Sequence, residues 1–136
     1  MKEPSHLLVK PNKKSKIYHN ITPESANWNH LSFEARELSL GDVWEHNTEE
    51  NELVIVLLSG NFKVDSTKGR WETINGRKDV FSGVAHTLYL PRHTKFTLEA
   101  TSENLDIAYG WCKSPVDFPA KFVTPEDTPV VIFGGD

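Results

Sequence analysis

The sequence predicts an all-β protein with the architecture of an antiparallel jelly-roll barrel. Short segments in which apolar and polar residues alternate recur along the chain, and Gly, Asn-Gly and Pro separate them. This spacing is typical of sandwiches and barrels of short antiparallel strands. The longest apolar run, residues 53–58, contains only Leu, Val and Ile, so it is too short and too rich in β-branched residues for a helix.

We expect residues 53–58 to form the central strand. One face of this strand carries Leu53, Ile55 and Leu57, and the other carries Val54, Val56 and Leu58. A strand of a free-standing barrel needs apolar side chains on its inner face only. The outer face should therefore be covered by residues 114–129, by a second barrel or by another copy of the chain. The alternative is that residues 1–12 and the last strand cover it.

The strands around the central run divide the chain into three regions. Residues 1–30 should form an N-terminal arm with an edge strand at residues 7–9 and one helical turn that begins at Thr22 and Pro23. Residues 31–113 should form the barrel. Alternation predicts its other strands at residues 31–36, 62–65, 71–74, 86–90, 95–100 and 105–111.

The third predicted region, residues 114–136, is a proline-rich segment that ends in a last strand. Phe118 and Phe122 should hold it against the barrel surface, and residues 130–133 should form a last strand. A second barrel would follow this region if the chain belongs to a two-barrel protein.

Composition excludes several classes of function. The formal net charge of −4 provides no basic surface for nucleic acid. No apolar segment approaches the roughly 20 residues of a membrane span. The single cysteine, Cys112, can form no internal disulfide, and no signal-peptide pattern follows Met1, so we expect a cytoplasmic protein.

A metal-binding signature of cupin barrels is present only in part. That signature supplies two histidines one residue apart, an acid and a later histidine, which strand alternation directs to one metal. Here Thr48 follows His46 where the second histidine is expected, and Phe96 stands at the last histidine position. The acid position falls on Glu52 or on Leu53, depending on the end from which the motif is counted. We therefore expect no tight metal site and no cofactor in this chain.

Four polar residues remain as candidates for binding a small ligand: His46, Glu52, His86 and Arg92. His46 adjoins an acidic loop, where a solvated, pH-responsive side chain is the simpler interpretation. His86 alternates with Leu88 and Leu90, so it either lies in the interior with a satisfied hydrogen bond or lines a polar pocket. Aromatic rings that could stack on a sugar are those of Trp44, Tyr89 and Trp111, although such rings in small barrels are more often part of the core.

Several separate blocks carry a resemblance to a known family. These blocks are residues 21–25 with Trp28, residues 57–60, residues 80–81 with Gly83, His86, and residues 89–91 with Thr94. Together they resemble the amino-terminal half of the 5-deoxy-glucuronate isomerases of myo-inositol catabolism, and they are similar to the related 5-keto-4-deoxyuronate isomerases. The resemblance covers nearly the whole chain. It implies two cupin barrels in one polypeptide, with a divalent metal such as Zn, Mn or Fe bound in the carboxy-terminal barrel.

The resemblance implies an aldose–ketose isomerisation of 5-deoxy-glucuronate to 5-dehydro-2-deoxy-gluconate, with this half mainly structural. It would pack against a second barrel or form a homo-oligomer. A stand-alone, non-catalytic cupin that binds a sugar acid through His46, His86 and Arg92 is a second hypothesis. A third is a single-barrel enzyme with an atypical site of His46, Glu52 and His86.

Overall fold

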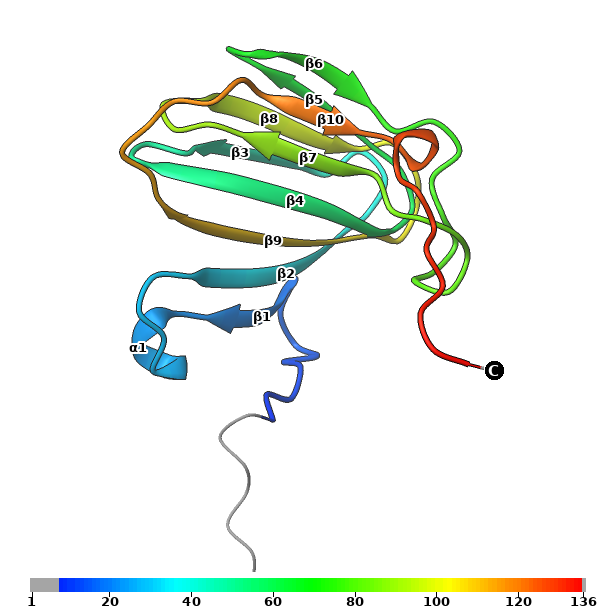
Figure 1. Cartoon of the computed structure of the whole chain (residues 1–136), viewed down its shortest axis with the longest axis horizontal. Coiled ribbons are helices and arrows are strands. Elements are labelled where there is room, and N and C mark those ends of the chain that lie inside the picture. The colour runs from blue at the N-terminus through cyan, green and yellow to red at the C-terminus, as the bar shows by residue number, and fades with distance from the viewer. Residues whose placement is uncertain (1–7, 136) are drawn as a thin grey trace, which may run out of the picture.

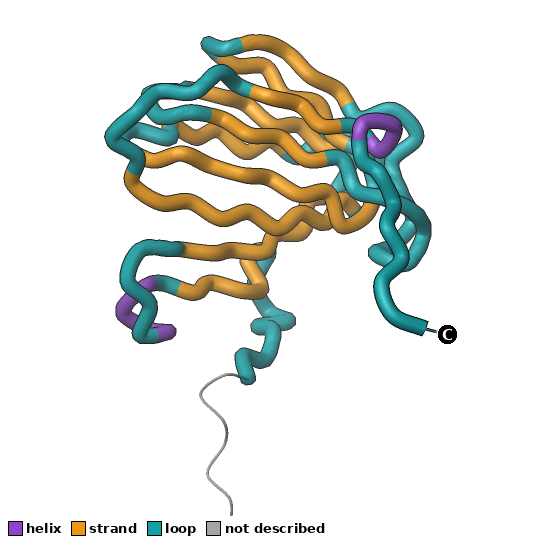
Figure 2. Tube along the Cα trace, viewed as in Figure 1, coloured by secondary structure: helices purple, strands orange, loops and turns teal. Residues whose placement is uncertain are grey.

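Two antiparallel β-sheets face each other in the computed structural model, which describes residues 8–135 (Figure 1). Strands make up most of the regular structure, and the connections between them are loops and turns (Figure 2). The strands are β1 (Ile17–Ile21), β2 (Ser32–Leu38), β3 (Val43–Asn47), β4 (Asn51–Ser59), β5 (Phe62–Ser66), β6 (Gly69–Glu72), β7 (Thr87–Leu90), β8 (Lys95–Ala100), β9 (Leu105–Lys113) and β10 (Lys121–Val123). Two short helices complete the set, α1 (Pro23–Ala26) and the 3-10 helix η1 (Pro125–Asp127).

The larger sheet has the strand order β1-β2-β9-β4-β7-β10, and the smaller has the order β3-β8-β5-β6. Every paired strand runs antiparallel to its neighbour. The predicted all-β, antiparallel fold class is therefore confirmed. The larger sheet has two more strands than the smaller one, and its edge strands are β1 and β10.

Strand β4 lies in the middle of the larger sheet, between β9 and β7. Its inward residues Leu53, Ile55 and Leu57 are at most 2% exposed. Burying each such side chain contributes about 1.5–3 kcal/mol to folding, so this strand anchors the core. On the other face Val54 is 38% exposed. The prediction of a central strand is thus confirmed, whereas the outer face of β4 is only partly covered within the chain.

The core lies between the two sheets and draws on both. Strands of the larger sheet contribute Leu38, Leu53, Ile55, Leu57, Leu88, Leu90, Leu105, Ile107 and Tyr109, and strands of the smaller sheet contribute Trp44, Phe62, Val64, Phe96, Leu98 and Ala100. Alternation places these residues on facing surfaces, because every second side chain of a strand points to the same side.

Tight turns match the predicted turn signals. Asn75 adopts a positive φ of 51°, and its neighbour Gly76 lies so close to another loop that a Cβ atom there would meet the Gly60 carbonyl oxygen at 1.9 Å. Only glycine fits at this position. The helical turn at Pro23 is also confirmed: the Thr22 hydroxyl accepts a hydrogen bond from the Ser25 amide at 3.1 Å, which caps α1.

The two ends of the chain differ from the prediction. Within the predicted edge strand at residues 7–9, residue 7 lies outside the described residues, and residues 8–9 form no strand. The edge strand is β1 instead, which pairs with β2. The strand predicted at residues 130–133 is wrong as well, because these residues lie in an exposed tail without a strand neighbour, with 63–89% of each side chain exposed.

The last strand is β10, which pairs with β7. It brings Phe122 against the core, as expected, while Phe118 remains 55% exposed. Residues 121–123 therefore extend the edge of the larger sheet.

We expect Leu57→Ala to lower the free energy of unfolding by about 2–5 kcal/mol, because the truncation opens a cavity between the sheets. Val54→Ala on the same strand removes a partly exposed side chain and should change stability by less than about 1 kcal/mol. Urea unfolding of both variants measures the difference. Equal losses would contradict the assignment of the inner and outer faces.

Candidate functional site

The positions that bear metal ligands in cupin barrels lie on the inner face at one end of β3, β4 and β8. His46 of β3 pairs with Phe96 of β8, and the two rings lie 5.8 Å apart between centroids. The Thr48 hydroxyl donates to the Pro91 carbonyl at 2.9 Å and accepts from an amide of the same turn at 2.9 Å, so its hydrogen bonds are used to close the turn. Of these side chains only that of His46 is suited to bind a transition metal.

The structure also decides between the two residues that could occupy the acid position. Leu53 points inward and is 2% exposed, whereas Glu52 points to the outer face. There Glu52 accepts a hydrogen bond from the Tyr89 hydroxyl at 2.9 Å, and the Cys112 thiol lies 3.7 Å from it. Burial, together with the Glu52 carboxylate, raises the pKa of Tyr89 to about 12. Glu52 therefore cannot join His46 at a common metal.

His86 lies at the opposite end of β4 from Thr48. Its carbonyl accepts a hydrogen bond from the Leu57 amide at 3.0 Å, whereas the Thr48 carbonyl accepts one from Asn51 at the start of the strand. The His86 ring is buried and stacks on Phe122 with 5.7 Å between centroids. Burial lowers its pKa. His86 is thus a packing residue beneath β10.

Arg92 forms an ion pair in a turn at the surface. Its Nε donates to an Asp117 carboxylate oxygen at 2.6 Å and ties the turn after β7 to the loop before β10. The four candidate residues from the sequence therefore occupy four different environments. They do not form one site.

A different set of residues comes together where β2 faces β3. Arg36 donates a hydrogen bond from Nε to the Tyr109 hydroxyl at 3.2 Å, and that hydroxyl donates to a Glu34 carboxylate oxygen. The Arg36 guanidinium lies 4.4 Å above the Trp44 ring, which stacks on Tyr109 with 4.4 Å between centroids. His46 lies beside Trp44 with 5.5 Å between centroids and completes what we call the edge cluster, formed by Glu34, Arg36, Trp44, His46 and Tyr109.

Sequence reasoning missed Glu34 and Arg36 because alternation does not say which side of a strand turns inward. The polar side of β2 faces the interior of the barrel, while Phe33 lies on the outer side. One signal was available in the sequence: Leu38 stands two residues after Arg36 and therefore on the same side of β2 as the polar residues. Leu38 is only 5% exposed, so that side of the strand faces inward.

Electrostatic effects within the edge cluster act on two of its members. Burial, followed by the hydrogen bond to Glu34, raises the pKa of Tyr109, which keeps its hydroxyl protonated as a donor. Burial and then the charge of Arg36 lower the pKa of His46, while Glu34 partly opposes this effect. The Tyr109 hydroxyl is thus held as a donor to Glu34, and the neutral form of His46 is favoured.

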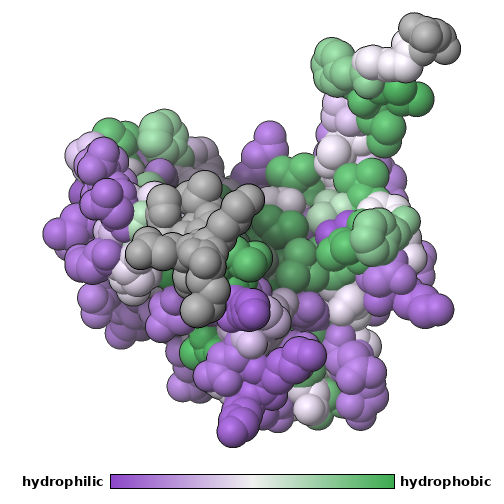
Figure 3. All heavy atoms as spheres, turned by 90° about the horizontal axis from the view of Figure 1, so that it is seen from below, coloured by the Kyte–Doolittle hydropathy of each residue, from purple (hydrophilic) through white to green (hydrophobic). Residues whose placement is uncertain are grey.

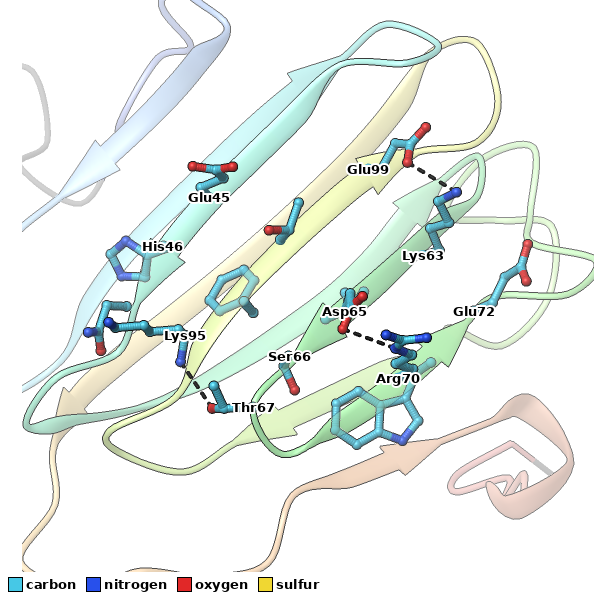
Figure 4. A pocket seen from close by; sticks show the side chains of 15 residues that line it. Glu45, His46, Lys63, Asp65, Ser66, Thr67, Arg70, Glu72, Lys95 and Glu99 are labelled. Carbon is cyan, nitrogen blue, oxygen red and sulfur yellow. Dashed lines mark hydrogen bonds and ion pairs between the residues drawn. The ribbon is translucent and has the colours of Figure 1, made fainter.

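Two hollows border this region. One of about 1140 Å³ lies over the four-stranded sheet and reaches His46 and Phe96 (Figure 4). Two ion pairs lie along it, Lys63–Glu99 and Arg70–Asp65, each of 3.1 Å (Figure 4). A second hollow of about 310 Å³ is lined by Arg36 together with residues from the starts of β1 and β3.

No group of three or more His, Cys, Asp or Glu side chains suited to a metal ion occurs within residues 8–135. The inner-face positions of the metal signature do not fit a divalent metal either, because Thr48, Leu53 and Phe96 occupy three of them. In the same part of the chain, no helix has the length and apolar character needed to cross a membrane.

Comparison with solved structures identifies the class of fold. The chain is similar to an IolB-like protein from Salmonella typhimurium LT2, with a TM-score of 0.86 and 23% identity over 94% of this chain and 49% of that one. It is also similar to the Cnp3 cupin domain of Schizosaccharomyces pombe, with a TM-score of 0.51 and 15% identity over 62% of this chain and 57% of that one. The fold is therefore a cupin jelly-roll barrel.

Sequence comparison then identifies the family. The model of the KduI/IolB family matches residues 7–136, and the chain belongs to this family. A 5-deoxy-glucuronate isomerase of Geobacillus kaustophilus (strain HTA426) is 31% identical over 134 residues, which are 96% of this chain and 46% of the relative. The chain thus spans about half the length of the curated relatives that it matches.

We expect the purified chain to hold no stoichiometric transition metal, because only one of the inner-face ligand positions carries a suitable side chain. Elemental analysis of protein purified without chelators measures this. One tightly bound Zn, Mn, Fe or Ni per chain would overturn the argument from Thr48 and Phe96.

The imidazole of His46 should titrate with a midpoint below the ordinary value of 6.5. Because the folded-state pKa of His46 lies below its unfolded value, its contribution to folding stability is fully present above the unfolded pKa and is lost as the pH falls from there through the folded-state pKa. NMR titration of His46 measures the midpoint. Arg36→Met should raise it and Arg92→Met should not, and a wild-type midpoint above 6.5 would contradict the assignment.

Proposed function

We propose that this chain is the structural barrel of a sugar-acid isomerase with two cupin barrels, and that its role is to support the second barrel. The observation that carries the proposal is the apolar outer face of the six-stranded sheet. A face of this kind on a soluble domain is typical of a surface that another domain or subunit covers.

Opposed residues of antiparallel strands share a face, so strand register defines the outer face. One row consists of His19, Ala35, Ala108, Val56 and Thr87, and the next row consists of Ile21, Phe33, Gly110, Val54 and Tyr89. We call these two rows the outer face. Most of its central residues are apolar and several are small, so another sheet can approach the backbone closely.

The surroundings of the outer face resemble the rim of an interface. Beyond one row lie Glu37 and Asp106, and beyond the other lies Glu52, so acidic groups flank the apolar rows at both ends. Hydrophobic residues gather in a hollow on the side from which the C-terminal tail projects (Figure 3). That tail itself carries exposed apolar residues at positions 130–133. An apolar centre, a polar rim and an adjacent apolar tail together favour a second barrel as the occupant.

The length comparison supports the same occupant. Relatives named 5-deoxy-glucuronate isomerase are about twice as long as the matched region, with 46% and 47% of their length covered in two examples. The remaining residues suffice for one more barrel of this size. We propose that the divalent metal of the family, such as Zn, Mn or Fe, belongs to that other barrel. As part of the same proposal, the enzyme would convert 5-deoxy-glucuronate to its ketose isomer in the cytoplasm.

A stand-alone cupin that binds a sugar acid without catalysis is the second candidate function. The edge cluster favours it, because Arg36 places a positive charge beside aromatic rings on the inner face. Of the residues first considered for this role, only His46 belongs to that cluster.

We expect the purified chain to associate through its outer face. In a solution of this chain alone, the only barrel that can cover this face belongs to a second copy. Val56→Asp should shift sedimentation toward the monomer, because the new carboxylate would lose its hydration in the contact. Val43→Asp is the matched control, since Val43 is 52% exposed and lies on the other sheet. A well-folded wild-type monomer, or equal effects of both substitutions, would refute the proposed surface.

The chain alone should not isomerise 5-deoxy-glucuronate, because its inner-face positions do not provide a metal site. A coupled assay of the ketose product measures this. Turnover on the order of 1 per second, a value within the ordinary enzyme range, would favour the single-barrel enzyme instead. If that rate then fell in His46→Ala but not in His86→Ala, the activity would belong to the edge cluster.

A further inference from the structure

We infer that the tail of one chain, residues 130–133, pairs with strand β6 of a second copy and adds a fifth strand to its smaller sheet. This inference goes beyond the structural role proposed above, because it concerns the smaller sheet and does not depend on the outer face. The partner is a second copy because an apolar tail and an open sheet edge that suits it both belong to this chain. Within one chain the tail runs away from β6 (Figure 1).

The tail has the composition of a strand but no strand neighbour. Residues 130–133 read Val-Val-Ile-Phe, and β-branched and aromatic residues favour strands. Of each side chain, 63–89% is exposed. No backbone hydrogen bond joins residues 129–135 to another described segment. Pairing with a sheet edge would satisfy these backbone groups and bury the apolar side chains at the same time.

Strand β6 is an edge strand whose outer side is open. Among the described residues it pairs only with β5. The Thr73 amide donates to the Phe62 carbonyl at 2.9 Å, and hydrogen-bonded and non-hydrogen-bonded pairs alternate along an antiparallel ladder. This register turns the backbone N–H and C=O groups of Arg70 and Glu72 away from β5. An added strand can pair with these groups.

The other three edge strands are less suited to receive the tail. Beside β1, the Asn12 amide donates to the Tyr18 carbonyl at 2.8 Å, so the segment before β1 already uses part of that edge. Along β3, Arg36 packs over the Trp44 ring. Strand β10 has only three residues and leads into the tail of its own chain. Strand β6 is therefore the best edge within the part of the chain that the structure describes.

Apolar surface and open space lie next to β6. The Trp71 ring packs so closely over Gly69 that a Cβ atom there would meet it at 2.9 Å, which places apolar surface at the edge of the sheet. The hollow over the four-stranded sheet extends to Arg70 and Glu72 (Figure 4). Alternate side chains of an added strand would thus lie beside Trp71 on one face and beside this hollow on the other.

Charge favours one direction of the tail. Exposed Lys68 lies in the turn before β6, whereas exposed Glu126 and Asp127 precede the tail. Opposite charges attract when the start of the tail lies beside this turn. In that arrangement the tail runs parallel to β6. A reversed tail would bring its acidic residues toward Glu72 instead.

The test is amide hydrogen exchange of the full chain, followed by NMR at the Arg70 and Glu72 amides. Such amides exchange quickly while they face solvent and slowly once they donate to a paired strand. We expect exchange at both to be at least about threefold slower at about 1 mM than at about 20 µM chain, because pairing between copies depends on concentration. The Glu45 amide, which faces outward from the edge of β3, should exchange at the same rate at both concentrations.

Replacing both Val131 and Ile132 by proline removes the central N–H groups of the tail, so the slowing should disappear. The matched control replaces Leu8 and Val9 by proline, because these are also neighbouring exposed aliphatic residues, 67% and 46% exposed, near the other end of the chain. This control should keep the slowing.

Arg70→Pro tests the edge itself. It removes one outward N–H without removing a hydrogen bond to β5, so the Glu72 amide should then exchange at the same rate at both concentrations. If Arg70→Pro fails to fold, the comparison of the tail variant with its control still decides.

Three results would overturn the inference: exchange at Arg70 and Glu72 that is independent of concentration, slowing that persists in the tail variant, or slowing that the control variant loses equally. A tail that binds β6 of its own chain would give the first of these results. Val56→Asp lies on the outer face of the larger sheet and should leave the slowing at β6 unchanged, so a failure of the structural role and a failure of this pairing can be told apart.

Discussion

Burial of the inner face of β4 between the two sheets is the interaction on which the rest of the structure depends. Leu53, Ile55 and Leu57 fill the centre of the core, and register with β9 and β7 then determines which side chains of the larger sheet point outward. Because the side-chain period of a strand is two, the same register that buries Leu53 sends Glu52 to the outer face. Packing of the core thus sends the acid nearest the signature's acid position, Glu52, to the outer face.

The inner-face positions that bear metal ligands in cupin barrels are part of the packing in this chain. Phe96 packs against Trp44 edge to face at 5.1 Å, and Thr48 closes a turn. A cluster of polar and aromatic side chains lies on the inner face at the edge between β2 and β3. The packed core, the edge cluster and the apolar outer face therefore occupy separate parts of one barrel.

Alternation and turn chemistry in the sequence predicted the fold class, the central strand and the turn at Asn75. The spacing of the metal signature also showed that Thr48 and Phe96 stand at two of its histidine positions. Three features could not be predicted in the same way. Alternation marks two sides of a strand but not the inner one, so the inward side of β2 was hidden. The choice between Glu52 and Leu53 depends on the register of β4 with β9 and β7, which follows from packing of the core. The exposed tail at residues 130–133 is as apolar as a strand but has no neighbour to pair with.

The central claim is that a second barrel covers the outer face, and the single cysteine allows a direct measurement. Cys112 pairs with Glu52 at one end of this face, and burial raises the pKa of its thiol. The rate of thiol labelling should fall as the protein concentration rises through the range of assembly, and in Val56→Asp it should not change. A labelling rate that is independent of concentration in the wild-type protein would contradict the account.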